Sequence, residues 1–580
     1  MSPVSRNSLP VDSLQKNSVV SPTPGFVRSY VPHLLLFTAI AYWVFQIAWF
    51  WRYCRHNINA DAISYIGIAR YLAACDFKAS LHGYWSPLVS WLIAAASLVV
   101  HDRTLAARLL MLILFAVCLA LVFALTQKLW GSRLLGAAAV LWFTAARGVA
   151  FFSISFIGAD LLFTATILSY FVLLLACLRE ADNSRHWLSL GIAHALSFLA
   201  KAVAMPLLAV LTLLAVICTS GKKPTQGLRR LLLAALIPVL VWAAWGTALR
   251  SKYGVFTTGY QLRWNLIDPT SKRARNSSEG LTVLQSTTKN YDDFMVSDVM
   301  PPGSPFWKAK ILRPSLPGYI LRNERQNLPQ AGKELLVLLT PGGVLALLVT
   351  TWRLARHGVV DRSRFFFAAI VLLGTLALAL AYCMLVFDGR YVIPIAPVLI
   401  ALSVGFAAPM KPQGSKNSKP LNPSFRLWQL ALTGLIAAGL LAVQLYRSSP
   451  FRSIRQDYQT SVYRAADSLR HSGARSIVSI GEGPYPEHGV GWEAGLYSAY
   501  FSDARIIAGL FAPLDGIAPN AILSDVSKLE VDAVLIWGTP SDPNYSALIN
   551  GLHAAHPAHS SLPILDSRKG EVGSVFFLRP

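Results

Sequence analysis

Two isolated aspartates are the first candidates for chemistry in this chain. Asp61 lies in NINADAISYIGIARY (57–71), shortly after an apolar stretch that ends at Trp51. An ionised carboxylate there can bind a divalent cation or remove a proton from an attacking hydroxyl. It can also stabilise the beginning of a helix, where capping and the helix dipole contribute about 1 kcal/mol. Both interpretations stay open, because the dipole that explains a cap also keeps the carboxylate ionised.

Asp160 raises the same question from within an apolar segment. In SFIGADLLFTATILSY (155–170) it stands near the expected outer end of a membrane span. A carboxylate there is costly unless it has a partner, so it is a functional candidate by default. Arg147 could be that partner, and a purely structural pair with Arg147 has equal weight. Asp61 and Asp160 are therefore candidate catalytic residues and candidate ligands of a divalent metal cation.

Two isolated cations, Lys201 in LAKAVAMP and Arg390 in FDGRYVIPIAP, belong to predicted outer turns. Basic residues are not expected there as topology signals. They could extend toward lipid head groups. They could also converge on a phosphate, because a leaving group that gains negative charge needs fixed positive partners. The second interpretation makes them candidate ligands of a donor phosphate.

An aromatic run, HGYWSP (82–87), completes the set. His82, Tyr84 and Trp85 are candidates for contact with a sugar ring or an acceptor. An aromatic belt at the membrane interface predicts the same residue types, and it is the safer interpretation for Trp85.

The composition indicates what must hold these residues in place. Of the 580 residues, 54% are hydrophobic and only 14% are charged, a profile typical of a polytopic α-helical membrane protein. Apolar segments long enough to cross ~30 Å of hydrocarbon recur between residues 33 and 446. The net charge of +23 does not indicate nucleic-acid binding, because the basic residues are scattered between apolar segments.

About eleven transmembrane helices are expected. A cytoplasmic N-terminus places most loop Lys and Arg residues in the cytoplasm, as the positive-inside rule requires. The short apolar segment 86–100 is then expected in the outer interface, beside a helix that starts near Asp61 and has Ser64 and Arg70 on its wetter side. The predicted spans are 33–51, 104–126, 133–151, 156–178, 187–200, 203–219, 230–249, 334–352, 365–387, 391–408 and 426–446.

The remaining segments complete the expected domain organisation. In the last of them, the strand-like ARSIVSIG, ARIIAGL and VDAVLIWG alternate with helix-like segments, which favours a small α/β domain. The predicted pieces are a disordered cytoplasmic tail (1–30), a membrane domain (31–446) with a first outer loop of juxtamembrane helices (52–103) and a long outer loop (250–333), and an extracytoplasmic α/β domain (447–580).

These motifs, in this order, resemble the integral-membrane glycosyltransferases of the GT-C fold. DAISYIGIARYL with GYWSPLVSWL is similar to their first outer loop, SFIGADLLF to a fourth-span motif with Asp, LAKAVAMP to a Lys-containing turn and GRYVIPIAP to an RYxxPxxP element. The resemblance covers about residues 33–408. It is closest to the bacterial RgtA/B/C/D-like families, which are related to protein mannosyltransferases and to the aminoarabinose transferase of lipid A. Many members have an acidic pair in the first loop, whereas Ala62 follows Asp61 here, so metal dependence stays open.

The resemblance implies transfer of a hexosyl or pentosyl group to an acceptor hydroxyl, on the extracytoplasmic side of a bacterial inner membrane. The implied partners are a polyprenyl-phosphate-linked sugar, membrane lipids and an acceptor that is a glycan, a lipid or a protein. Asp61 would be the catalytic carboxylate, and Asp160 would support it or ligate a cation. Lys201 and Arg390 would hold the phosphate of the donor.

Two other classes of function compete with this one. A multi-pass transporter or flippase of envelope lipids would have charges near the bilayer midplane and broken helices in paired halves. The candidate charges here cluster toward one face instead. A non-catalytic surface scaffold is the third class, in which Asp61 only stabilises a helix.

Overall fold

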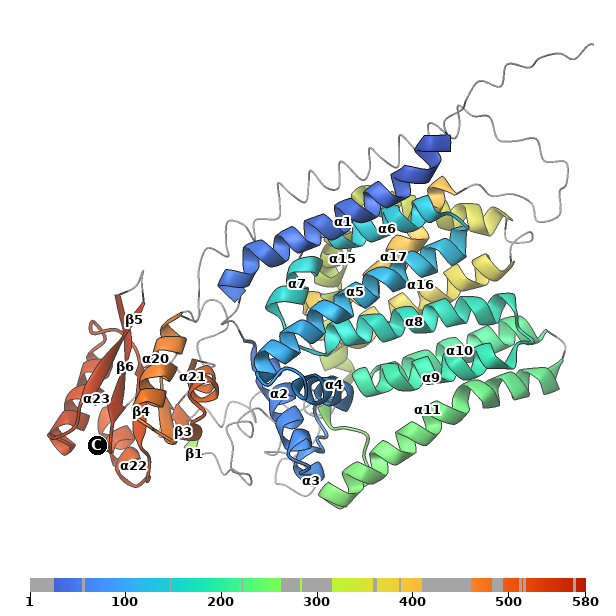
Figure 1. Ribbon diagram of the computed structural model, residues 1–580. Coiled ribbons are helices and arrows are strands. Elements are labelled where there is room, and N and C mark those ends of the chain that lie inside the picture. The colour runs from blue at the N-terminus through green and yellow to red at the C-terminus, as the bar shows by residue number, and fades with distance from the viewer. Residues whose placement is uncertain are drawn as a thin grey trace, which may run out of the picture.

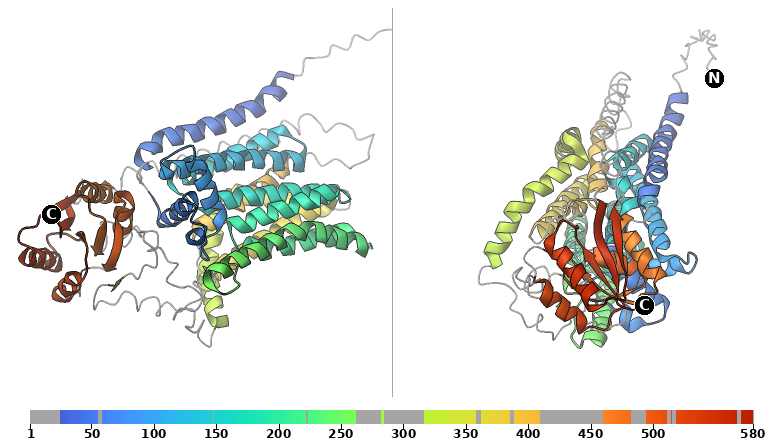
Figure 2. Two further views of the ribbon diagram at one scale, coloured as in Figure 1. Left: turned by 60° about the horizontal axis from the view of Figure 1, so that its bottom comes forward. Right: turned by 90° about the vertical axis from the view of Figure 1, so that its left-hand side faces the viewer.

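A bundle of helices forms the first part of the described chain, and an α/β domain lies at one end of it (Figures 1 and 2). The fold is that of a polytopic helical membrane protein with a further domain outside the bundle. The computed structural model describes residues 25–54, 58–146, 148–221, 223–261, 282–283, 316–357, 362–384, 388–408, 460–481, 494–510, 514, 518–566 and 570–579.

The bundle consists of long apolar helices and a few short ones. The elements are α1 (Gly25–Cys54), α2 (Ala60–Ala73), α3 (Phe77–Ser80), α4 (Pro87–Ser97), α5 (Arg103–Trp130), α6 (Arg133–Ala145), α7 (Val149–Ser155), α8 (Ala159–Arg179), α9 (Ser184–Ala200), α10 (Ala204–Ser220), α11 (Pro224–Tyr253), α15 (Leu316–His357), α16 (Arg362–Cys383), η2 (Gly389–Val392), α17 (Ala396–Ser403) and η3 (Val404–Ala407).

Local sequence signals set the ends of α5, a central helix of the bundle. The Asp102 carboxylate accepts hydrogen bonds from the backbone N–H groups of Thr104 and Leu105, which caps the first turn. Gly131 follows the last turn with φ of 70°, the left-handed conformation that glycine adopts without a steric penalty. Between these signals, 28 residues run without a break.

Within the part of the chain that the structure describes, six helices are long and apolar enough to cross a membrane: α1, α5, α8, α11, α15 and α16. They correspond to six of the predicted spans. The predicted span 133–151 corresponds to α6 and α7, which are bent by 57° and would make a seventh. The predicted spans 187–200, 203–219 and 391–408 correspond to the shorter helices α9, α10 and α17. The span 426–446 lies outside the described residues, so the count of eleven stays a prediction.

Helices α2, α3 and α4 lie at the end of the bundle that faces the α/β domain (Figure 1). Helix α2 packs against both α4 and α5. Most of its surface is therefore covered, and Ser64 is only 3% exposed. The expectation that Ser64 lies on a wetter side of this helix was wrong.

The α/β domain is built on a six-stranded mixed sheet with the strand order β1-β3-β2-β4-β6-β5. Strands β3, β2 and β4 are parallel, whereas the other neighbouring strands pair antiparallel. Alternate residues of a strand serve two cores: Ile477 packs into the cluster with α20 and α21, and Val478 into the cluster with α22 and α23. The elements are β1 (Thr282–Val283), α20 (Thr460–His471), β2 (Ser476–Ile480), α21 (Ala494–Ser502), β3 (Arg505–Leu510), α22 (Pro519–Ser527), β4 (Ala533–Trp537), α23 (Pro543–Ala555), β5 (Ser561–Asp566) and β6 (Gly570–Phe577).

Candidate active site

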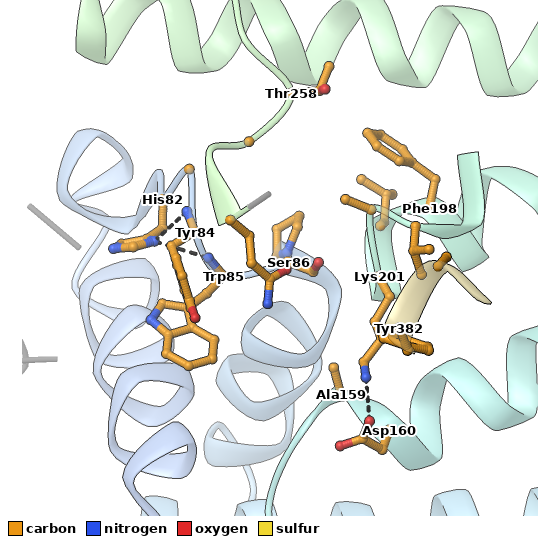
Figure 3. Close-up of a pocket in the computed structure, with 18 of the residues that line it drawn as sticks. His82, Tyr84, Trp85, Ser86, Ala159, Asp160, Phe198, Lys201, Thr258 and Tyr382 are labelled. Carbon is orange, nitrogen blue, oxygen red and sulfur yellow. Dashed lines mark hydrogen bonds and ion pairs between the residues drawn. The ribbon is translucent and has the colours of Figure 1, made fainter. Parts of the chain in front are cut away.

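Four segments that are far apart in the sequence bring four charged side chains to one cavity. Asp61 lies in the first turn of α2, Asp160 in the first turn of α8, Lys201 directly after α9, and Arg390 in η2. All four line a cavity of about 750 Å³. Figure 3 shows part of this cavity, with Lys201 directed at Asp160. The structure therefore brings together the four charged residues that the sequence singles out.

Asp61 is held by Arg390. The guanidinium Nη1 donates a hydrogen bond to Asp61 Oδ2 at 2.8 Å, and Nε lies 3.1 Å from Asp388 Oδ2. The guanidinium also lies 4.8 Å from the ring centre of Phe156, a distance typical of a cation–π contact. Burial lowers the pKa of Arg390, but the nearby acidic groups, with Asp61 and Asp160 first among them, together raise it above its usual value. A permanent positive charge thus stands beside the candidate base.

Asp160 and Lys201 form a second, more deeply buried ion pair. Lys201 Nζ donates a hydrogen bond to Asp160 Oδ1, and the exposed fractions of the two side chains are 17% for Lys201 and 4% for Asp160. Burial lowers the pKa of Lys201, but the Asp160 carboxylate and the hydroxyls of Tyr382 and Tyr391 together raise it above its usual value, so the ammonium stays charged. Arg147, the partner considered for Asp160 from the sequence, lies outside the described residues.

Two stacked tyrosines flank the ammonium group of Lys201. The ring centres of Tyr382 and Tyr391 are 4.2 Å apart, with an angle of 13° between the planes. Lys201 Nζ lies 4.8 Å from the centre of Tyr391 and 5.5 Å from that of Tyr382. Tyr391 belongs to the GRYVIPIAP motif, so a signal for it existed. Tyr382 lies in the last turn of α16, where nothing in the sequence distinguishes it from other membrane-interface tyrosines.

Asn59 fixes the two aspartates relative to one another. It is the N-cap residue of α2, yet its side chain makes no bond to that helix. Instead, Asn59 Nδ2 donates to the carbonyl of Ile157 and Asn59 Oδ1 accepts from the N–H of Ile157, both at 3.0 Å. Ile157 lies three residues before Asp160, so this pair joins the beginning of α2 to the beginning of α8. The motifs did not single out Asn59, although an Asn before a helix is a common cap signal.

His82 shapes the aromatic loop and points away from Lys201 and Asp160 (Figure 3). Its Nδ1 accepts hydrogen bonds from the backbone N–H groups of Tyr84 at 3.1 Å and Trp85 at 3.2 Å. Burial lowers the pKa of His82 to about 3, so the imidazole is neutral near neutral pH. The geometry thus gives His82 a place within the loop, as a support for the two aromatic side chains.

Tyr84 and Trp85 both line the cavity, but they differ in access. Trp85 is only 8% exposed, and its ring contacts Tyr65 at 5.1 Å and Tyr84 at 4.7 Å between centres. Tyr84 is half-buried. Burial raises the pKa of Tyr84, as does the nearby Asp61, so its phenol keeps its proton. Of these two residues, Tyr84 is therefore the better placed to donate a hydrogen bond to a hydroxyl in the cavity.

The donor set of the cavity does not fit a resident divalent metal. Each of the two aspartates is already paired with a cation. Within the described ranges, no group of three or more His, Cys, Asp or Glu side chains comes together, whereas a Ca²⁺ or Mg²⁺ site needs several oxygen ligands. The metal role of Asp61 and Asp160 stays a hypothesis without support from this geometry, and no step below depends on it.

Comparison with known proteins places these features in a wider context. Residues 84–245, less than a third of the chain, match the family model described as dolichyl-phosphate-mannose-protein mannosyltransferase. No curated protein matches the chain significantly by sequence. Among solved structures, ArnT from Cupriavidus metallidurans, bound to undecaprenyl phosphate or in the apo state, is similar with a TM-score of 0.51 and 11% identity, over 94% of this chain and 97% of ArnT.

A further solved structure, arabinofuranosyltransferase AftD from Mycobacteria, aligns with a TM-score of 0.49 and 12% identity, over 94% of this chain and 40% of AftD. At 11% identity the similarity to ArnT concerns the fold. The alignment with ArnT spans nearly the whole of both chains. The chain thus has the GT-C fold of integral-membrane glycosyltransferases, as its sequence motifs predicted.

Proposed function

We propose that the protein is a membrane glycosyltransferase that moves a sugar from a polyprenyl-phosphate donor to an acceptor hydroxyl on the extracytoplasmic side of a bacterial inner membrane. One observation carries the proposal: a single cavity combines two carboxylate–cation pairs with an apolar lining. The fold supports it, and the ArnT structure of similar fold is described as bound to undecaprenyl phosphate.

The cavity suits a donor with a charged head and an apolar tail. Among the described residues, Lys201 and Arg390 are the cations that line it, and they would hold the donor phosphate. Buried isoprenoid chain contributes about 0.8 kcal/mol per methylene, so a lipid-linked donor needs no nucleotide-binding loop. The apolar part of the lining includes Ala159, Phe198, Leu199, Ala202, Val203, Pro206, Trp245, Ile320, Ala381 and Met384.

The ion pairs indicate how binding leads to reaction. In this structure Arg390 neutralises Asp61, and a donor phosphate would compete for the same guanidinium. Once Arg390 turns to the phosphate, the Asp61 carboxylate is free to accept a proton. The acceptor oxygen then forms a bond to the anomeric carbon while the bond from that carbon to the phosphate oxygen breaks. Asp61 takes the hydroxyl proton, and the lipid phosphate leaves with the bonding electrons, stabilised by Lys201 and Arg390.

The substitution Asp61→Asn tests this role directly. An amide of the same shape cannot take the proton, so we expect kcat to fall by about 10²- to 10⁴-fold, with donor binding retained. The assay measures transfer from radiolabelled polyprenyl-phosphate sugars by purified protein in proteoliposomes. Asp76→Asn is the matched control, because Asp76 caps α3 outside the cavity and Asn caps equally well.

Wild-type transfer rates from Asp61→Asn would refute the catalytic role. The rival class is tested in the same vesicles. A protein that carries the lipid-linked sugar across the bilayer but transfers it to no acceptor would be a flippase, and the proposal would then be wrong.

A further inference from the structure

We propose that the C-terminal α/β domain positions the Asp61 helix, through contacts that α21 and Asp503 directly after it make with α2 and α5. This inference rests on the proposed function, because it takes Asp61 to be the catalytic carboxylate. On this proposal the domain contributes to the reaction by holding Asp61 in position, rather than by binding a separate ligand.

Two polar contacts join the domain to the bundle. Arg70 in the last turn of α2 donates a hydrogen bond through Nη1 to Asp503 Oδ1 at 3.2 Å, and the two groups form an ion pair. Thr104 in the first turn of α5 and Tyr500 of α21 share a hydrogen bond of 2.5 Å between their hydroxyl oxygens. Asp503 and Tyr500 lie at the same end of α21, so the two contacts attach one short segment to two helices.

Apolar packing continues across the same boundary. The cluster of buried apolar side chains in the bundle extends without a break into α20, α21 and one face of the sheet, and Tyr500 and Phe501 pack against it. Helices α2 and α21 are themselves in contact. The polar contacts therefore lie at the edge of a packed interface, which restricts their movement.

Helix α2 transmits this contact to the cavity. Asp61 and Arg70 are nine residues apart in an unbroken helix, which corresponds to about 14 Å along the axis and about half a turn around it. Asp61 lines the cavity on one side, and Arg70 reaches the α/β domain on the other. A shift of either end moves the other, because a helix of this length behaves as a rigid rod.

The backbone conformation of Asp503 indicates that its carboxylate is needed for the contact with Arg70. Asp503 has φ of 60°, and the N–H of Ala504 donates to the carbonyl of Ala499 at 3.0 Å. This is the left-handed end of a helix, where glycine is the favoured residue because it has no Cβ. An aspartate at this position strains the backbone, whereas glycine would not. In exchange, Asp503 provides the carboxylate that Arg70 binds.

The geometry permits a variant that removes the contact without straining the domain. Asp503→Gly fits the left-handed backbone better than the natural residue, and Tyr500→Phe removes only a hydroxyl. For the double variant we expect α2 amides to exchange with deuterium about fivefold faster or more, and kcat to fall by a similar factor. The donor KM should stay within about twofold of wild type, since Lys201 and Arg390 lie on other elements.

The control is Asp525→Asn, which removes an exposed ion pair with Lys528 at 3.2 Å on α22 of the same domain. Deuterium exchange in α2 and kcat should both match wild type in this variant. The inference is overturned if the double variant behaves like the control in α2 exchange.

Hydrogen exchange separates this inference from the proposed function. Faster α2 exchange in the double variant supports the coupling even if the wild-type protein transfers no sugar, in which case only the proposed function fails. Transfer by the wild type with unchanged α2 exchange and kcat in the double variant overturns the coupling alone.

Discussion

A buried imidazole that accepts two backbone hydrogen bonds must stay neutral. His82 is 8% exposed, and its Nδ1 faces the N–H groups of Tyr84 and Trp85. Protonation would turn that acceptor into a donor that faces two other donors. Burial, followed by the charge of Lys252, lowers the pKa of His82 from 6.5 to about 3. Protonation of His82 at acid pH would therefore disrupt the aromatic loop, whereas a change of pH above neutrality would not affect it.

Because the pKa of His82 is lower in the folded state than in the unfolded state, acid should destabilise the fold. Above pH 6.5 His82 is neutral in both the folded and the unfolded state, and it contributes no pH dependence. As the pH falls below 6.5, the unfolded state binds a proton that the folded state does not. The free energy of unfolding should then fall by about 1.4 kcal/mol per pH unit until the pH nears the folded value, and the melting temperature in detergent between pH 8 and pH 5 measures this.

In His82→Asn, a neutral amide oxygen can accept the same hydrogen bonds, so part of this pH dependence should disappear. His101→Asn, on the exposed turn before α5, should keep the wild-type curve. Parallel curves for wild type and His82→Asn would show that His82 is not the group that titrates.

The kinds of residue in the site could be predicted from the sequence, but their pairing could not. Asp160 and Lys201 are separated by 41 positions and Asp61 and Arg390 by 329. A charged residue within an apolar segment can be recognised from the sequence, because burying a charge is costly unless it has a function or a partner. Which opposite charge it meets depends on how the helices pack, and no local pattern records that.

At the scale of elements, the junction between α2 and α8 decides where the two aspartates stand. Asn59 side-chain atoms pair with both backbone groups of Ile157, and Ile157 is 1% exposed. Loss of these bonds would leave a buried N–H and a buried carbonyl without their partner, which costs about 1–3 kcal/mol. It would also free the beginning of α2 to move relative to α8.

Asn59→Ala should therefore lower kcat by more than its loss of stability would explain. We expect kcat to fall by about tenfold to a hundredfold, because misplacement by about 1 Å can have that effect. The measurement is kcat together with the unfolding temperature of the same preparation.

Asn183→Ala is the matched control for Asn59→Ala. Asn183 caps α9 through the N–H of Arg185, so its loss should cost about 1 kcal/mol of stability with kcat unchanged. If both variants lose kcat in proportion to their loss of stability, Asn59 has no positioning role.

The spacing of apolar residues predicted the helix that contains Asp61, but it wrongly predicted that the side with Ser64 is exposed to water. Periodicity gives the direction of one apolar stripe, and α2 has neighbours on more than one side. Ser64 is buried for that reason. Similarly, the short strand β1 belongs to the segment 250–333 that was predicted as a long outer loop, and it pairs with β3 of the α/β domain, a pairing that only tertiary structure can create.

At the scale of the molecule, helices α2 and α4, which contribute residues to the cavity lining, lie at the same end of the bundle as the α/β domain (Figure 1). Helix α5 has 28 residues, which makes it about 42 Å long, more than the ~30 Å of hydrocarbon that it must cross. Its first turn lies near the cavity end, and Arg133 begins the next helix beyond its other end. Residues at these two ends should therefore lie on opposite sides of the membrane.

Cysteine labelling tests which side the cavity occupies. Cys75, which follows α2 at the cavity end, is exposed, whereas the other cysteines are buried or half-buried. The distribution of basic loop residues predicts a cytoplasmic N-terminus and an extracytoplasmic cavity. A membrane-impermeant maleimide should then label Cys75 in intact spheroplasts. In a background with Cys75→Ser and Cys218→Ser, Arg133→Cys should react only after the membrane is opened. The reverse pattern would place the cavity in the cytoplasm, where a sugar carried on the outer leaflet could not reach Asp61, and the proposed reaction would then need a donor from the other side.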